Sequence, residues 1–163
     1  MNIQIREATP EEYAEAGAVT ASAYREFVRG GDWEDYLESI ADVEGRADRT
    51  TIVIALDGTR IVGSATLELT DRVEPDDDPA LDPAEAHVRM LGVAPEARRR
   101  GIARALMADC MDRARAGGKT FLTLHTTDRM AAAQRMYESL GFVRGSDRVF
   151  PDGFVLLTYR AEL

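Results

Sequence analysis

The stretch from His87 to Gly117 constrains the fold more than any other part of the chain. Residues 87–93 are mostly apolar and alternate, which is typical of a strand, and Pro95 ends that strand because proline has no N–H to donate. Apolar side chains then repeat at the helical period until Gly117 and Gly118, where we expect the helix to end. The sequence therefore predicts a strand, a tight turn and a long helix that begins near Glu96 to Arg98.

Three consecutive arginines, Arg98, Arg99 and Arg100, lie at the expected start of this helix. Unpaired N–H groups and the helix macrodipole already place positive charge there, so cations are unfavourable. Gly101 weakens the helix by roughly a further 0.5–1 kcal/mol relative to alanine. A bound anion would account for both features, since the N–H groups and guanidiniums would face its phosphates. A solvated basic turn is the alternative, and the arginines alone do not decide between the two.

Two motifs resemble the GNAT superfamily of acyl-CoA-dependent N-acetyltransferases. Residues 93–103, Val-Ala-Pro-Glu-Ala-Arg-Arg-Arg-Gly-Ile-Ala, resemble its motif A, in which Arg98, Gly101 and Ala103 match the pattern of Arg or Gln, two residues, Gly, one residue, then Gly or Ala. Residues 133–142 resemble its Ala-x-x-Leu-Tyr-x-x-x-Gly-Phe segment. The resemblance covers nearly the whole chain. It implies an α/β fold with a mixed, twisted sheet of about seven strands and helices on both faces.

The same resemblance implies a reaction and a co-substrate. An acetyl group would move from acetyl-CoA, without a metal, to a primary amine that attacks the thioester directly. In GNAT enzymes the pantetheine arm lies in a gap beside the strand, and Gly92 is itself typical of a bulge or a close approach. The pyrophosphate would contact amides of the following turn. The cofactor-binding residues implied are Leu91, Gly92, Val93, Arg98, Arg99, Arg100, Gly101, Ile102, Ala103, Met130 and Ala133.

The acceptor amine needs a base, because an alkylamine with a pKa near 10.4 is neutral in only about one molecule in two thousand at pH 7. Alternation along the strand places His87 and Glu85 on one face with Arg89 and Leu91, which makes both of them candidates. GNAT relatives often carry Glu where this chain has His87, and this slightly favours His87. A partly buried structural histidine is the alternative, and His125 on the next strand is a weaker candidate.

The leaving thiolate needs a proton donor, and the resemblance gives this role to Tyr137. A core tyrosine is the alternative, because Tyr137 lies on the apolar face of its helix. Many relatives have Asn seven residues before this tyrosine, where this chain has Met130.

Two helices are expected near the amino terminus. One begins with a capping box at Thr9, runs towards Phe27 and stops at Gly30-Gly31; the other is capped by Asp32 and ends near Gly45. In the GNAT family such helices lie over the acceptor site. Their aromatic residues either line an acceptor pocket or simply pack the helices on the sheet; these are Tyr24, Phe27, Trp33 and Tyr36.

Acidic residues near the same site predict a small cationic acceptor, because they would attract it electrostatically. They lie in the proline-studded loop of residues 71–83 and on the facing helix, and they are Asp76, Asp77, Asp78, Asp82, Glu34 and Asp35.

The remaining elements follow from periodicity and turn signals. They are a strand at 3–6, a hairpin of 51–56 and 60–69 that turns at Asp57-Gly58, a strand at 120–126 beside that at 87–93, a helix capped by Asp128 and ended by Gly141, and a last strand at 154–160 after a turn at 151–153.

Composition limits the class of protein. A chain of 163 residues predicts a single domain over residues 1–163. The net charge of −9 argues against a nucleic-acid partner. No apolar run is long enough for a membrane span, and there is no signal-peptide pattern. A single cysteine, Cys110, is expected in the core and fits a cytoplasmic location.

Two other functions stay open on the sequence alone. One is acetylation of a protein N-terminus or lysine, and the other is a non-catalytic CoA-binding regulatory module. The oligomeric state is also open, a homodimer included.

Overall fold

The structure, a computed structural model, describes residues 2–27, 32–74 and 78–163. Within these residues one sheet has the strand order β1-β2-β3-β4-β5-β8-β6, with β7 also paired to β8. Neighbouring strands are antiparallel except for β4 and β5, which are parallel. The strands are β1 (Ile3–Glu7), β2 (Thr51–Asp57), β3 (Arg60–Glu68), β4 (Glu85–Val93), β5 (Phe121–Thr127), β6 (Val143–Arg144), β7 (Arg148–Val149) and β8 (Val155–Glu162).

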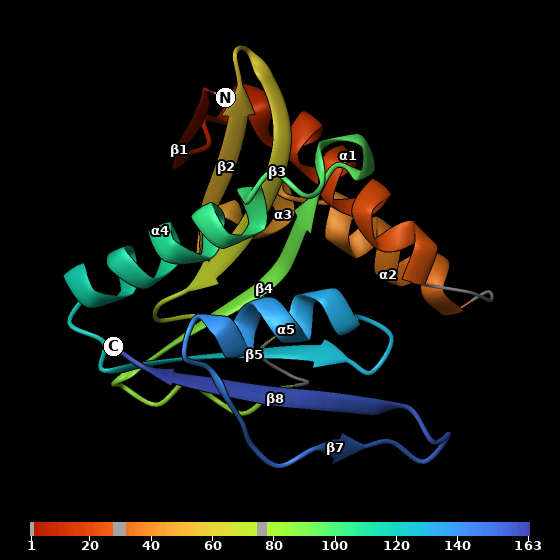
Figure 1. The fold of residues 1–163 in the computed structure, drawn as a ribbon, viewed down its shortest axis with the longest axis vertical. Helices are drawn as coiled ribbons and strands as arrows, with labels where there is room; N and C mark the ends of the chain where they lie inside the picture. Colours follow the sequence, from red (N-terminus) through yellow and green to blue (C-terminus); the bar gives the residue numbers. More distant parts are fainter. Residues whose placement is uncertain (1, 28–31, 75–77) are drawn as a thin grey trace.

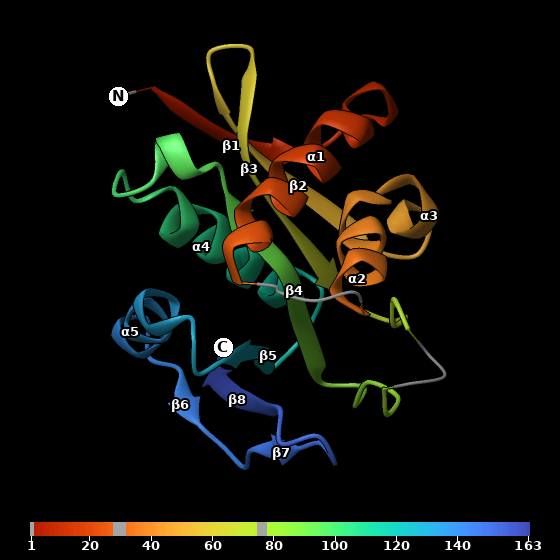
Figure 2. The same cartoon turned by 90° about the vertical axis from the view of Figure 1, so that its right-hand side faces the viewer.

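Helices cover both faces of this sheet, as expected. The α-helices are α1 (Tyr13–Tyr24), α2 (Asp32–Ala41), α3 (Glu44–Ala47), α4 (Ile102–Ala116) and α5 (Ala131–Ser139). Figures 1 and 2 show α4 and α5 on one face and α1, α2 and α3 on the other. Cys110 of α4 is fully buried, and burial raises the pKa of its thiol to about 12. The mixed α/β architecture and the core position of this cysteine are therefore confirmed.

The central feature is the separation of β4 from β5. The two strands pair only from Glu85 opposite Phe121 to Val88 opposite Leu124, although both continue further. Just beyond the last pair, the β3–β4 ladder shifts register. There Met90, at a φ of 54°, and Leu91 together oppose a single residue of β3. Such a bulge bends a strand and increases its twist. The gap that the family resemblance implied beside this strand is thus present.

Because of the bulge, the side chains of β4 do not alternate between the two faces of the sheet as the sequence predicted. Leu91 does not share a face with His87 and Arg89, because the extra residue reverses the alternation. Leu91 packs against the cluster that contains Leu106 of α4, whereas Met90 belongs to the cluster between α1 and α2.

The start of α4 differs from the prediction as well. The helix begins at Ile102, and not near Glu96 to Arg98. Pro95–Ala97 forms a short 3-10 turn, Arg98 is extended, and Arg99 and Gly101 have positive φ values of 65° and 77°. Positive φ is incompatible with a right-handed helix, so the three arginines form a turn that precedes the helix.

Three further boundaries are corrected or lie outside the described residues. Met130, and not Asp128, occupies the position before α5, because β5 extends to Thr127 and a turn must follow it. Gly45 lies inside α3 and does not end α2, which stops at Ala41. The expected helix end at Gly30-Gly31 lies outside the described residues. Gly58, Gly118 and Gly141 do have the positive φ expected of their turns.

A buried arginine holds the end of α2 against the sheet. Arg46 is only 2% exposed, and its guanidinium donates hydrogen bonds to the carbonyls of Ser39, Ile40 and Asp42. Its Nε donates to Thr66 Oγ1 on β3 at 3.1 Å. Burial lowers the pKa of this guanidinium to about 10. Arg46 thus supplies donors to carbonyls that a helix end leaves unpaired.

We expect Arg46→Met to lower the free energy of unfolding by about 2–4 kcal/mol, because buried carbonyls would lose their donors. Urea denaturation measures this change. The control is Arg60→Met, which removes an exposed ion pair with Glu96 and should cost less than about 1 kcal/mol. Equal losses in the two variants would contradict the role of Arg46.

Candidate active site

Two adjoining cavities lie where β4 and β5 part. Cavity A, of about 690 Å³, is lined by the end of β4, by the turn before α4 together with the first residues of α4, and by α5. Cavity B, of about 730 Å³, is lined by β4, α2 and the turn before β8. The residues that line both cavities are Tyr24, Phe27, His125, Thr126, Arg129 and Met130. A molecule in one cavity can therefore meet a molecule in the other at this shared boundary.

Cavity A brings together nearly all of the expected cofactor-binding residues. Those that line it are Leu91, Gly92, Val93, Arg98, Arg99, Gly101, Ile102, Ala103, Met130 and Ala133. Arg100 is the exception, because its guanidinium pairs with Asp57 of β2 at 3.0 Å, away from the cavity.

The arginines of the turn are not equivalent. Arg98 pairs with Glu26 and donates to the Ala23 carbonyl at 3.3 Å, so it ties the turn to the end of α1. Arg99 makes no hydrogen bond or ion pair with any other described residue. Its side chain is therefore the one in this turn that keeps its full donor capacity for a ligand.

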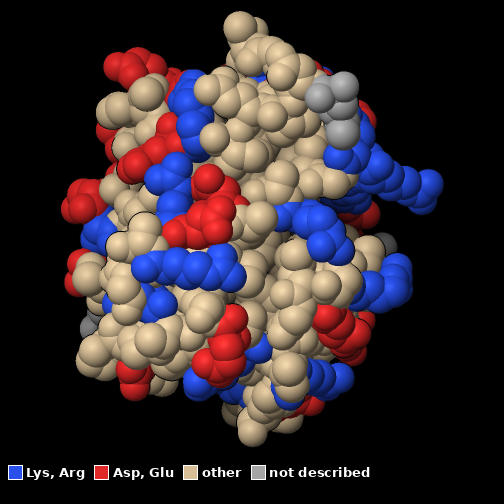
Figure 3. Space-filling model, turned by 60° about the vertical axis from the view of Figure 1, so that its left-hand side comes forward, with Lys and Arg blue, Asp and Glu red and all other residues tan. Residues whose placement is uncertain are grey.

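The charge of cavity A is one-sided. Four arginines line it, and none of its described lining residues is a carboxylate; they are Arg98, Arg99, Arg104 and Arg129. Arg104 and Arg129 were not predicted from the sequence, because Arg104 lies in the first turn of α4, after the motif, and Arg129 lies between β5 and α5. Basic and acidic side chains are interspersed on the face shown in Figure 3. The uniform sign inside the cavity favours an anionic ligand.

Close packing explains why position 92 is a glycine, and the sequence alone did not show this. A Cβ at this position would lie 3.0 Å from Ala23 Cβ and 3.2 Å from Thr20 Cγ2. The glycine therefore lets α1 approach β4 closely, and the bulge lies at Met90 and Leu91 instead.

Tyr137 lines cavity A from α5. It is 6% exposed and packs edge-on against Phe142, with Tyr159 on another side. Its hydroxyl makes no hydrogen bond with another described residue. Burial raises the pKa of the phenol above its usual value, so the group stays protonated at neutral pH. It can act as a donor.

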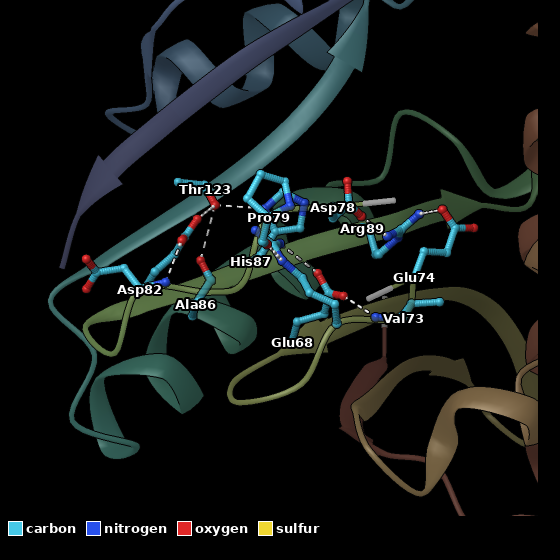
Figure 4. Close-up of polar contacts among 12 residues, drawn as sticks. Glu68, Val73, Glu74, Asp78, Pro79, Asp82, Ala86, His87, Arg89 and Thr123 are labelled. Atoms are coloured by element: carbon cyan, nitrogen blue, oxygen red, sulfur yellow. Dashed lines mark hydrogen bonds and ion pairs between the residues drawn. The ribbon is translucent and has the colours of Figure 1, made fainter. Parts of the chain in front are cut away.

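His87 and Glu85 are connected through Thr123 of β5. Figure 4 shows His87 beside Thr123. The Thr123 hydroxyl donates to Glu85 Oε2, and His87 Nδ1 lies 2.7 Å from the same hydroxyl oxygen. A hydroxyl has one hydrogen, so His87 Nδ1–H must be the donor and Nε2 carries the lone pair. Glu85 lines neither cavity, whereas His87 lines cavity B.

The surroundings of His87 keep it neutral. It is 3% exposed, and burial, with His125, Arg72 and Arg89 nearby, holds its pKa well below the ordinary value. His125, given less weight from the sequence, is exposed at the boundary of the two cavities, with its ring 5.0 Å from that of His87. A neutral histidine with an open Nε2 can accept a proton.

The expected acidic residues are arranged differently from the prediction. Asp76 and Asp77 lie outside the described residues. Asp82, Glu34 and Asp35 are exposed and do not line cavity B. Asp78 does line it, but as an ion-pair partner of Arg89 at 3.1 Å (Figure 4).

The expected aromatic residues all reach cavity B. Tyr24, Phe27, Trp33 and Tyr36 line it, together with Phe150 and Phe154, which the sequence analysis did not single out. The two phenylalanines flank the turn at 151–153, and this position beside the turn is the sequence signal that could have indicated them.

Comparison with known proteins identifies the family. The model of the acetyltransferase (GNAT) family matches residues 11–142, most of the chain. The protein therefore belongs to the GNAT family and is an acyl-CoA-dependent N-acetyltransferase whose co-substrate is acetyl-CoA. No curated protein sequence matches the chain.

Solved structures share the fold at low sequence identity. An acetyltransferase of the GNAT family from Staphylococcus aureus Mu50 is 19% identical, with 99% of each chain covered and a TM-score of 0.73. The PaiA N-acetyltransferase from Thermoplasma acidophilum, in complex with coenzyme A, is 14% identical, with 100% of each chain covered and a TM-score of 0.74.

The described residues contain neither a membrane-spanning helix nor a cluster of metal ligands. None of their helices is long and apolar enough to cross a membrane. In the same part of the chain, no group of three or more His, Cys, Asp and Glu side chains could hold a metal ion.

We expect His87 to make the protein less stable in mild acid. Above about pH 6.5 His87 is neutral in both the folded and the unfolded chain, so its contribution is complete. As the pH falls below 6.5, the unfolded chain takes up a proton that the buried ring does not, and the free energy of unfolding decreases.

The measurement is urea denaturation at several values between pH 7.5 and 5.5. His87→Gln should flatten this pH dependence, and His125→Gln should flatten it less because burial lowers the pKa of His125 less than that of His87. A wild-type slope unchanged in His87→Gln would show that this ring titrates normally.

Proposed function

We propose that the protein acetylates the primary amine of a small cationic molecule held in cavity B, by direct attack of the amine on the thioester of acetyl-CoA held in cavity A. The observation that carries the proposal is the meeting of a basic cavity and a histidine-containing cavity where β4 and β5 part. We propose that residues 1–163 form one domain for this reaction and that it takes place in the cytoplasm.

The residues of cavity A fit acetyl-CoA. Arg99, with its unused donors, would bind the pyrophosphate together with backbone N–H groups of the turn that ends at Gly101. Leu91, Gly92 and Val93 have no strand partner on the β5 side, so their backbone groups can bind an extended arm by strand addition. Met130 and Ala133 would contact that arm from α5. Acetyl-CoA supplies an activated acetyl group at the shared boundary.

The residues around the boundary would move two protons. His87 Nε2 would accept the proton of the acceptor amine, directly or through water, with Glu85 and Thr123 holding the Nδ1–H tautomer. Tyr137 would donate a proton to the departing thiolate, since its phenol is protonated and makes no hydrogen bond with another described residue. The low pKa of His87 keeps it unprotonated, so it can act at neutral pH.

We expect Arg99→Ala to weaken acetyl-CoA binding by roughly ten- to a hundred-fold, because a charge-assisted hydrogen bond contributes about 1.5–3 kcal/mol. Isothermal titration calorimetry measures the dissociation constant. Arg100→Ala, which removes a neighbouring charge that pairs with Asp57, should change it much less. Equal effects would mean that general positive charge, and not Arg99 itself, binds the phosphates.

We expect Tyr137→Phe to bind acetyl-CoA normally but to turn over about 10²–10⁴-fold more slowly, the usual effect of losing a general acid. The change removes one hydroxyl that makes no hydrogen bond within the described part of the chain, so packing is preserved. The measurement is kcat with one acceptor beside the acetyl-CoA dissociation constant. Equal kcat values would remove Tyr137 from the chemical step. If the wild type released no thiol with any amine, this result would support the alternative of a non-catalytic CoA-binding module.

A further inference from the structure

Cavity B has an unusual concentration of aromatic side chains. The chain contains five Phe, five Tyr and one Trp, and six of these eleven residues line this cavity. They come from the end of α1, from α2 and from the turn before β8, and they are Tyr24, Phe27, Trp33, Tyr36, Phe150 and Phe154. Segments far apart in the sequence thus supply one aromatic surface.

Five of these rings form a continuous series of contacts. Tyr24 meets Tyr36 at a centroid distance of 6.5 Å, and Tyr36 meets Trp33 at 5.9 Å. Trp33 meets Phe154 at 5.4 Å, and Phe154 meets Phe150 at 5.7 Å. Because neighbouring rings support one another, the surface is preorganised.

These rings are not buried in the core. All six are intermediate in exposure, in contrast to Tyr137, Phe142 and Tyr159, which are buried. Packing the helices on the sheet therefore leaves these six residues partly exposed. A ligand with an apolar body would remove that remaining area from water, and this is favourable.

The charges of cavity B offer little to a polycation. Its described carboxylates are matched in number by guanidiniums; they are Glu74, Asp78 and Asp152 against Arg89, Arg129 and Arg148. Arg89 pairs with Glu74 at 3.4 Å and with Asp78 at 3.1 Å, and Arg148 lies 3.8 Å from Asp78. A second ammonium group near Glu74 or Asp78 would have to compete with these internal cations.

The lining of cavity B also determines how an acceptor would be oriented in it. His125 lies at the boundary with cavity A, where the reacting amine must be. Trp33, Tyr36, Phe150 and Phe154 line cavity B alone. An amine at the boundary would therefore leave the rest of its molecule among these four rings.

We propose that cavity B selects arylalkylamines: acceptors with one primary amine joined by a short chain to an aromatic ring. This inference rests on the proposed function and narrows it from small cationic amines to those with a single ammonium group and an aromatic body. The ring stacks against Trp33 and Phe154, and the amine reaches His87 and His125.

The first test compares three acceptors by thiol release from acetyl-CoA: phenethylamine, n-propylamine without the ring, and spermidine as a polycation. Phenethylamine should give a higher kcat/KM than either other amine by roughly ten- to a hundred-fold, the effect of burying one aromatic ring. A preference for spermidine, or equal values for the first two amines, overturns the inference and leaves the proposed function intact.

A matched pair of variants ties the preference to the cavity. Phe154→Leu should reduce the advantage of phenethylamine over n-propylamine several-fold without changing the acetyl-CoA dissociation constant. Phe121→Leu, whose ring lies against Arg160 outside both cavities, should leave the advantage unchanged. Equal effects of the two substitutions contradict a role for the aromatic surface.

A binding measurement separates this inference from the proposed function. Trp33 is the only tryptophan of the chain, so its fluorescence reports directly on cavity B. With coenzyme A present, phenethylamine should change this fluorescence at lower concentration than n-propylamine does. If this holds but no amine releases thiol, the proposed function fails and the binding inference stands. If neither signal is seen, both are overturned.

Discussion

Both cavities depend on the point at which β4 and β5 stop pairing. Beyond Val88 and Leu124, β4 is held on one side only, by its ladder with β3. Backbone groups left without a partner inside a protein are costly, so the open side of β4 favours an extended ligand that supplies hydrogen bonds. The bulge at Met90 bends β4 at this point, so the same distortion opens the gap and reverses the alternation of the strand.

The charges of the two cavities then favour a different ligand in each. Cavity A collects four guanidiniums and no described carboxylate in a protein of net charge −9, whereas the described charges of cavity B balance. A polyanionic co-substrate is therefore favoured in one cavity only. In the proposed selectivity the acceptor is recognised mainly by shape and by apolar contact, because aromatic rings supply both with little loss of side-chain entropy.

Burial prepares the two groups that would transfer protons. The same loss of water lowers the pKa of His87 and raises that of Tyr137, because in each case burial disfavours the charged form. At neutral pH the His87 ring is therefore unprotonated and the Tyr137 phenol is protonated, which are the forms that the proposed proton transfers require. The hydrogen-bonded connection through Thr123 adds orientation, since it leaves Nε2 as the free nitrogen of the His87 ring.

The sequence by itself determined the family, the order of the strands and helices, the turn glycines and most of the residues around cavity A. These depend on local periodicity and on motifs only a few residues long. The tertiary structure decided which arginine of the turn makes no ion pair with the described residues, because Asp57 and Glu26, which pair with Arg100 and Arg98, are remote in sequence. It also decided the face of Leu91 and the convergence of Trp33 with Phe154, since a bulge and a contact between residues so far apart in the chain leave no periodic signal in the sequence.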